Sequence, residues 1–186
     1  ISWEYRDGIR VTDDEGMSFI KMAAFDVSNR IMTRLSGERQ TAVIGNWVRA
    51  RGRGVRDGVD YGSAGLVDRI ELDSLVAALD DGFIPIIPCV GWTTTGKPYN
   101  ISSTELAVAT AVALKAEKLF FMGSGATISV DDYRMPPNAA VSSEGRMAAI
   151  AVDEIDSFIE MNKGVEKAEC PLSELADLLA QSREAC

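Results

Sequence analysis

The run Phe83–Ile87 (FIPII) and its flanking segments decide the fold predicted for this chain. The run is apolar without alternation, which is typical of a strand buried on both faces of a sheet. Pro85 indicates an edge or an irregular spot in that strand, because proline donates no backbone hydrogen bond. Upstream, the apolar spacing from Leu72 to Leu79 predicts a short helix that stops at Gly82.

Downstream of this strand, the chain turns back and enters another helix. The segment Gly91–Tyr99 predicts a small hairpin with its turn at Thr95-Gly96. Ser102–Glu105 (SSTE) is a capping box, in which side chains satisfy the first amides of a helix, and the box explains Glu105. That helix reaches about Lys115, and Leu119–Met122 (LFFM) predicts another buried strand.

The N-terminal part begins with a long helix. Thr12–Glu15 (TDDE) is a capping box with Thr12 as the cap, and the apolar stripe from Met17 to Leu35 ends near Gly37. Two further segments predict strands: Thr41–Asn46 and Val67–Ile70. Since strands and helices alternate, the chain is expected to be an α/β protein with a parallel sheet and right-handed crossovers.

Glycines and prolines mark the remaining segments. Arg49–Tyr61 contains three glycines and predicts a loop or an irregular hairpin. Residues 124–138 predict a loop, Met147–Asn162 a helix, and Pro171 begins a final helix. We therefore predict a core at residues 1–123, and a loop with two helices at 124–186 that continues the same domain and is truncated before its C-terminal half.

Composition excludes several classes of function. A net charge of −9 argues against nucleic-acid binding. The basic cluster Arg49, Arg51, Arg53 and Arg56 is either a solvated or inter-subunit edge or an anion site. No run approaches the ~18 apolar residues of a membrane span, and no signal peptide is expected.

Histidine is absent, and the three cysteines show no metal-ligand spacing. A histidine-based zinc site, a Ser-His-Asp triad and a Cys-His dyad are therefore excluded within this sequence, and no metal site is predicted. Thiol usage fits a reducing cytoplasm, so a cytoplasmic location is expected.

Two segments carry a resemblance to the amino-acid kinase superfamily, in its acetylglutamate branch. They are Asp7–Asp13 (DGIRVTD), which leads into the long helix, and Phe83–Gly91 with Gly96–Ile101 (GKPYNI). The resemblance implies a three-layer amino-acid-kinase (carbamate-kinase-like) fold with a mainly parallel sheet and helices on both faces, incomplete here. It also implies that Arg10 grips a substrate carboxylate and that Asn100 hydrogen-bonds the same ligand, chemistry that suits a guanidinium and an amide.

Other segments resemble the kinase-like domain of bacterial N-acetylglutamate synthases more than the kinases. These are Gly45-Asn46, Gly58–Tyr61 and Gly65–Ile70. In that family the domain precedes an acetyltransferase that uses acetyl-CoA and L-glutamate in the first step of arginine synthesis. The resemblance implies L-arginine sensing, assembly into a homo-oligomer, ligands among L-glutamate, N-acetylglutamate and L-arginine, and no cofactor in this chain.

Departures from the kinases argue against phosphoryl transfer. Acetylglutamate kinases carry Asn and Asp where this sequence has Ser102 and Thr104, and that Asp organises the catalytic lysines. Phosphoryl transfer depends on such positioning and charge, so we predict no catalytic residue in this chain. Two alternatives stay open: an ATP-dependent acetylglutamate kinase, or a non-catalytic amino-acid-binding module.

Each candidate residue also has a plainer interpretation. Arg10 could be a surface arginine near a helix start, and Asn100 could stabilise the turn before the next helix. The three tryptophans are expected to pack rather than to stack on a cofactor. Asp57 and Asp60 are expected to lie in a solvated glycine loop rather than to bind a metal.

Overall fold

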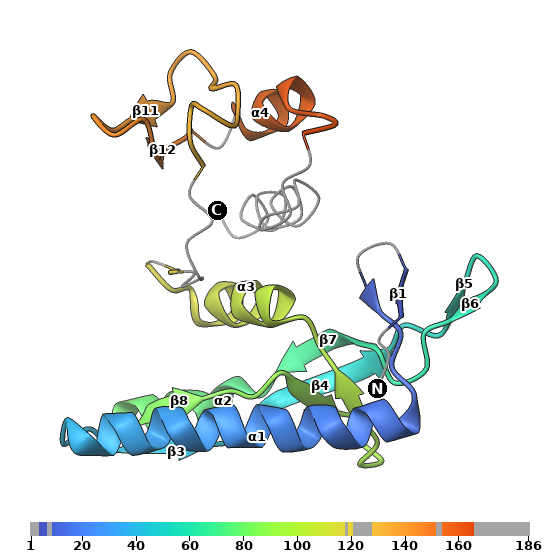
Figure 1. The fold of residues 1–186 in the computed structure, drawn as a ribbon. Helices are drawn as coiled ribbons and strands as arrows, with labels where there is room; N and C mark the ends of the chain where they lie inside the picture. The colour runs from blue at the N-terminus through green and yellow to red at the C-terminus, as the bar shows by residue number, and fades with distance from the viewer. Residues whose placement is uncertain (1–3, 7–8, 118, 121–127, 152–153, 166–186) are drawn as a thin grey trace. The chain divides into compact units, whose positions relative to one another are not determined.

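The computed structural model describes residues 4–6, 9–117, 119–120, 128–151 and 154–165. The chain forms two compact units, Ile1–Leu119 and Phe120–Cys186 (Figure 1). The sequence-based division at residues 123 and 124 stays a prediction about the organisation of the domain.

The first unit alternates strands and helices along the chain. Its elements, in order, are β1 (Tyr5–Arg6), β2 (Ile9–Arg10), α1 (Asp14–Gly37), β3 (Ala42–Ile44), β4 (Val48–Gly52), β5 (Val55–Arg56), β6 (Val59–Asp60), β7 (Gly65–Ile70), α2 (Leu72–Asp80), β8 (Ile84–Ile86), β9 (Val90–Trp92), β10 (Pro98–Asn100) and α3 (Ser103–Leu114).

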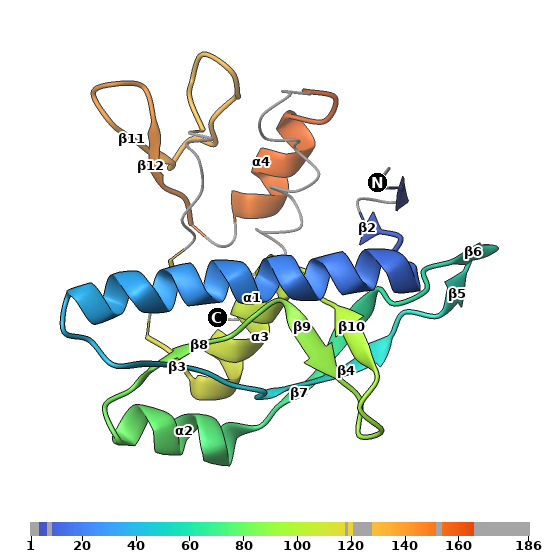
Figure 2. The same ribbon diagram turned by 60° about the horizontal axis from the view of Figure 1, so that its bottom comes forward.

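A four-stranded sheet in the order β10-β9-β4-β7 forms the centre of this unit. Strand β4 runs parallel to β9 and antiparallel to β7, and β3 pairs in parallel with β8. Helix α1 lies along one face of the sheet and α3 along the other (Figures 1 and 2). This is the α/β arrangement with helices on both faces that the sequence predicts.

The two faces have separate apolar cores. On one face, Met17 and Ile20 of α1 pack with Val90 of β9. On the other face, Leu106 of α3 joins a buried cluster that consists of Val48, Ala50 and Ile101. Because Ile101 follows Asn100 directly, the second cluster holds the end of β10, which carries one of the two candidate ligand residues.

Helix α1 begins one residue later than its capping box predicts. The N-cap is Asp13, whose carboxylate accepts the amide hydrogen of Gly16 at 2.6 Å. Thr12 was the wrong choice, although both residue types are strong N-caps. Its hydroxyl instead forms hydrogen bonds with the Arg10 carbonyl and the Asn100 side chain.

The prediction of a loop or irregular hairpin at Arg49–Tyr61 was wrong for its first part, where β4 is a central strand. Gly52 in β4 and Gly65 in the adjacent β7 make room for a side chain rather than break their strands. A Cβ atom on Gly52 would lie 2.9 Å from the Tyr99 hydroxyl, and one on Gly65 would lie 2.6 Å from Tyr99 Cβ. The remainder is a hairpin, β5–β6.

The second unit holds a small hairpin and one described helix. Strands β11 (Ala140–Val141) and β12 (Met147–Ala149) pair antiparallel, and α4 spans Ile155–Met161. The predicted helix over Met147–Asn162 was wrong in its first half, because the chain folds back at Ser142–Arg146. Met147 and Phe158 nonetheless share one core with Tyr133.

Several predictions fall outside the described residues. They concern the second half of the strand predicted at Leu119–Met122, the first residues of the loop predicted at 124–138 and the helix predicted to begin at Pro171. The first half of that buried strand was wrong, because Leu119 and Phe120 form no strand and are 37% and 78% exposed. Among the helices that the structure does describe, none is both long and apolar enough to span a membrane.

Candidate functional site

Three segments that are distant in sequence meet at Thr12, which is fully buried. The Thr12 amide donates to the Tyr61 carbonyl at 3.4 Å, and its carbonyl accepts the Ser63 amide at 2.6 Å. The Ser63 carbonyl in turn accepts the amide of Asn100 at 2.8 Å. The start of α1, the β6–β7 connection and the end of β10 are thereby held together.

Gly62 permits this close approach. Its φ is +57°, in the left-handed region, and a Cβ atom there would collide with the Thr12 carbonyl oxygen. Asp60 supports the same turn, since its carboxylate accepts the Gly62 amide at 2.9 Å. This contact gives Asp60 a role in the turn.

The Asn100 side chain lies on Thr12. Its Nδ2 donates to Thr12 Oγ1 at 3.2 Å, across 88 positions of sequence. Thr12 Oγ1 donates to the backbone carbonyl of Arg10 at 3.2 Å. The structure therefore brings the two predicted ligand residues into one hydrogen-bonded chain, with Thr12 between them.

The Arg10 guanidinium contacts Tyr5. Its Nε and Nη2 donate to the Tyr5 hydroxyl at 3.0 and 2.7 Å, and its Cζ lies 5.4 Å from the centre of the ring. The hairpin β1–β2 places these two residues opposite each other. Arg10 is thus half-buried, with its cation oriented by Tyr5 and its backbone carbonyl bonded to Thr12.

Glu105 does more than the capping box suggests. Ser102 caps α3 by accepting the Glu105 amide, as predicted. The Glu105 carboxylate, however, accepts the Val67 amide at 2.8 Å and pairs with Arg53 at 3.1 Å. Both charged side chains are largely buried, so this pair ties α3 to the central sheet.

The basic cluster is divided among different partners. Arg53 pairs with Glu105, whereas Arg49 pairs with Glu71 at 3.0 Å. Arg51 and Arg56 are exposed. The cluster therefore does not act as one cationic surface.

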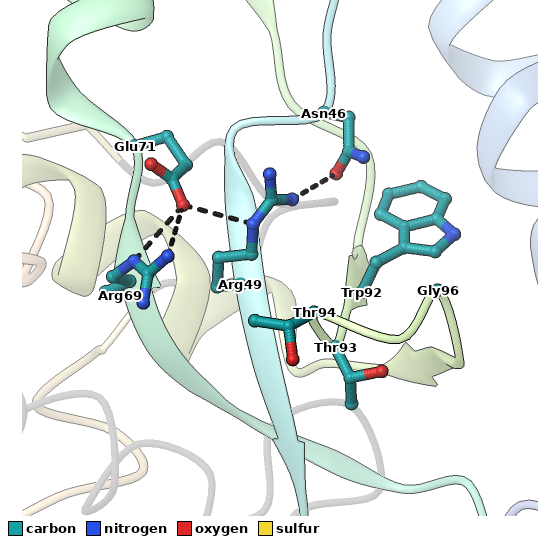
Figure 3. Close-up of a pocket in the computed structure, with 8 residues that line it drawn as sticks. All are labelled: Asn46, Arg49, Arg69, Glu71, Trp92, Thr93, Thr94 and Gly96. Carbon is teal, nitrogen blue, oxygen red and sulfur yellow. Dashed lines mark hydrogen bonds and ion pairs between the residues drawn. The ribbon is translucent and has the colours of Figure 1, made fainter.

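Arg49 lies in a pocket of about 440 Å³ near the tip of the β9–β10 hairpin. Figure 3 shows the guanidinium groups of Arg49 and Arg69 turned toward one carboxylate, Glu71. Asn46 accepts a long hydrogen bond from Arg49 at 3.4 Å, and Trp92 forms part of the wall. The two arginines and one glutamate give this pocket a local charge of +1.

No group of three metal-binding side chains occurs among the residues that the structure describes. Burial raises the pKa of the Cys89 thiol, which disfavours the reactive thiolate form. Trp47 is buried and Trp92 packs beside Val90 and Phe25, as expected for packing residues. Trp3 lies outside the described residues.

Sequence reasoning missed Thr12 as the junction of the site. A signal was present, because Thr12 follows Arg10 by two residues and precedes Asp13, an equally good helix cap. The contact with Asn100 depends on tertiary structure.

The sequence and the fold together identify the class of protein. The chain belongs to the amino acid kinase family, whose family model matches residues 3–164. The resemblance found in the sequence is confirmed at this level.

Its relatives point to one branch of that family. The chain is 36% identical over 137 residues to the amino-acid acetyltransferase of Escherichia coli K12, covering 69% of this chain and 31% of the relative. It is 30% identical over 184 residues to the amino-acid acetyltransferase of Ralstonia nicotianae, covering 90% and 41%. The chain thus spans about a third of the length of the first of these relatives.

Solved structures agree with this branch. N-acetylglutamate synthase of Neisseria gonorrhoeae, complexed with coenzyme A and N-acetylglutamate, matches with a TM-score of 0.76 and 28% identity. The match covers 99% of this chain and 39% of that protein. The same synthase with coenzyme A and L-arginine gives a TM-score of 0.77 at 26% identity.

Proposed function

We propose that this chain is the kinase-like region of an N-acetylglutamate synthase. The whole protein would transfer the acetyl group of acetyl-CoA to the amino group of L-glutamate, the first step of arginine biosynthesis. In this proposal the region binds N-acetylglutamate or L-arginine, takes part in a homo-oligomer and catalyses no reaction itself. Acetyl-CoA is the cofactor of the whole protein, and we assign no residue of this chain to it.

Arg10 and Asn100 support binding of a small carboxylate. Arg10 supplies a guanidinium, which matches a carboxylate with two parallel N–H donors. Asn100 supplies an amide that can both donate and accept. The Thr12 junction holds the backbone of Arg10 and the side chain of Asn100 in one hydrogen-bonded chain. An amino-acid derivative with a carboxylate and a neighbouring polar group fits this pair.

The proposal rests on the acidic residues at the start of α3. The aspartate that the kinases have there is absent, and the neighbouring glutamate has other partners. Thr104 stands where the kinases have their organising aspartate, and a hydroxyl cannot replace that charge. Glu105 is the nearest carboxylate in sequence, but Val67 and Arg53 occupy both of its oxygens. Phosphoryl transfer relies on positioned charge, and this arrangement leaves none at that point.

Assembly has support of a different kind. Helix α1 exposes large apolar side chains on one side at a spacing of three residues, namely Phe19, Met22 and Phe25, of which Met22 is 64% exposed. Apolar patches on a folded surface mark interaction sites, and a second copy of the chain is the partner that we propose.

We place the protein in the cytoplasm, where its proposed substrates are found, with neither nucleic acid nor membrane as a partner.

The test uses the protein encoded by the complete reading frame that contains this chain. With acetyl-CoA and L-glutamate, we expect glutamate-dependent release of the CoA thiol, measured with a thiol reagent, and inhibition by L-arginine. Absence of glutamate-dependent release would overturn the proposed enzyme. If arginine still bound by calorimetry, the alternative of a non-catalytic amino-acid-binding module would replace it.

A further inference from the structure

We propose that the pocket beside Arg49 and Arg69 is a separate small-molecule site, which binds a monocarboxylate with a flat apolar body. The pocket has a volume of about 440 Å³, within the range of ~300–1,000 Å³ that is usual for ligand sites. Neither Arg10 nor Asn100 lines it, so this inference goes beyond the proposed function and does not depend on it.

Three pocket side chains form a row across neighbouring strands. Arg49 on β4 is the register partner of Trp92 on β9 and of Arg69 on β7. Side chains of cross-strand partners lie next to each other on one face of a sheet, and like charges directly opposite each other destabilise it. The two arginines therefore need negative charge from outside the row.

Glu71 supplies only part of that charge. A single carboxylate oxygen, Oε1, accepts Arg49 Nε at 3.0 Å and the Nε and Nη2 of Arg69 at 3.1 and 2.9 Å. Glu71 thus orients both guanidinium groups, but one negative charge balances only one of them. The pocket keeps one positive charge for an anion from solution.

The guanidinium groups also keep hydrogen-bond donors for such an anion. Arg49 Nη2 and Arg69 Nη1 donate to none of the residues that the structure describes. Arg49 Nη1 makes only the long contact of 3.4 Å to Asn46. The two terminal nitrogens of Arg49 form an edge with parallel N–H groups, which matches the two oxygens of a carboxylate. The Arg49 side chain is 27% exposed, so a ligand can reach it while protein shelters the rest.

Charge and shape together define the class of ligand. A monocarboxylate brings the net charge of the pocket to zero, whereas a phosphate dianion leaves it at −1. Figure 3 shows the Arg49 guanidinium between Glu71 and the side of the pocket that Trp92 forms. Trp92 is held in place by Phe25, with 6.5 Å between the ring centres. A flat apolar group that follows the carboxylate would lie against the indole.

The experiment is a titration of the unmodified chain with 3-phenylpropionate at constant ionic strength, followed by tryptophan fluorescence. We expect saturable binding, at least about tenfold tighter than that of the uncharged 3-phenylpropionamide, which lacks charge-assisted hydrogen bonds. Inorganic phosphate should bind more weakly than 3-phenylpropionate. The fluorescence change should be lost in Trp92→Phe.

Two substitutions in the pocket should have opposite effects. Glu71→Gln raises the charge of the pocket from +1 to +2 and should tighten binding of 3-phenylpropionate about fivefold, the effect of one unit charge at ~4 Å in water. Arg49→Gln should weaken binding by about tenfold or more. Arg51→Gln is the matched control, because Arg51 lies exposed on the same strand and does not line the pocket, so affinity should not change.

Several results would overturn the inference: no saturable binding, tighter binding of phosphate than of 3-phenylpropionate, weaker binding by Glu71→Gln, or full binding by Arg49→Gln. Should Arg49→Gln not fold, Arg69→Gln decides, since its side chain is 57% exposed and adds little to stability. It should weaken binding about fivefold, and unchanged affinity would contradict the site. Arg10→Ala should bind 3-phenylpropionate like the unmodified chain. Loss of binding there would assign the probe to Arg10 instead and leave the proposed function standing.

Discussion

Arg10 is the residue on which the proposed binding of a carboxylate depends. Its guanidinium is held against Tyr5 by two hydrogen bonds and by the face of the ring, so it is oriented before a ligand arrives. We expect N-acetylglutamate to raise the melting temperature of the unmodified chain and to have no effect on Arg10→Ala, measured by differential scanning fluorimetry. Arg6→Ala is the control, since Arg6 is exposed and pairs with Glu4. An undiminished shift in Arg10→Ala would remove Arg10 from the site.

Gly62 tests whether the Thr12 junction is as tight as the structure indicates. Gly62→Ala should cost about 3 kcal/mol or more in the free energy of unfolding, because it adds a clash with Thr12 to the strain of a left-handed backbone. Gly54→Ala has the same kind of backbone, φ +70°, but open space around it, and should cost about 1 kcal/mol. Urea denaturation measures both. Equal losses would mean that the junction is loose.

For single residues, the sequence predicted where helices start, but it did not predict which partners the side chains of Thr12 and Glu105 would have. The run Thr12–Glu15 (TDDE) correctly predicts the start of a helix, but Thr12 and Asp13 are equally suitable caps. In the folded chain, Asn100 donates a hydrogen bond to the Thr12 hydroxyl from 88 positions away, and Asp13 is the helix cap. Glu105 was explained by a local capping box, whereas its carboxylate serves Arg53 and Val67. Both corrections come from contacts that no local pattern contains.

Among the elements, helices were predicted closely and short strands less so. Helix α1 ends at Gly37 and α3 caps at Ser102, because their apolar spacing and caps are local signals. Strand β4 was missed because the glycines at 52, 54 and 58 suggest a loop, whereas Gly52, the one that lies in the strand, gives space to Tyr99. The apolar residues from Met147 onward follow helical spacing although the segment forms a strand and then a helix. Side chains of both elements pack into one small core, and this produces the misleading pattern.

Helix α1 also carries the prediction about assembly. Met22→Glu places a charge on its exposed apolar side, and we expect a smaller molecular mass by analytical ultracentrifugation than for the unmodified chain. The free energy of unfolding of the folded unit should change by about 0.5 kcal/mol or less, since Met22 is 64% exposed. Val112→Glu on α3, at a position that is 45% exposed, is the control. A monomeric unmodified chain, or an unchanged mass in Met22→Glu, would contradict assembly through α1.

For the molecule as a whole, the fold class and the family were predictable from the order and spacing of several segments together. The two faces of the sheet, with α1 on one and α3 on the other, follow from the alternation of strands and helices. The arrangement of the site was less predictable. It needs three segments to meet at one buried hydroxyl, and only the folded chain shows that they do.

The central claim is that a carboxylate site inherited from small-molecule kinases persists here without phosphoryl transfer. The most direct test is ADP release by the protein from the complete reading frame, supplied with ATP, Mg²⁺ and N-acetylglutamate and followed by a coupled assay. We predict a rate equal to that without N-acetylglutamate, under conditions where calorimetry shows N-acetylglutamate bound. ADP release that depends on N-acetylglutamate would contradict the claim and identify a working acetylglutamate kinase.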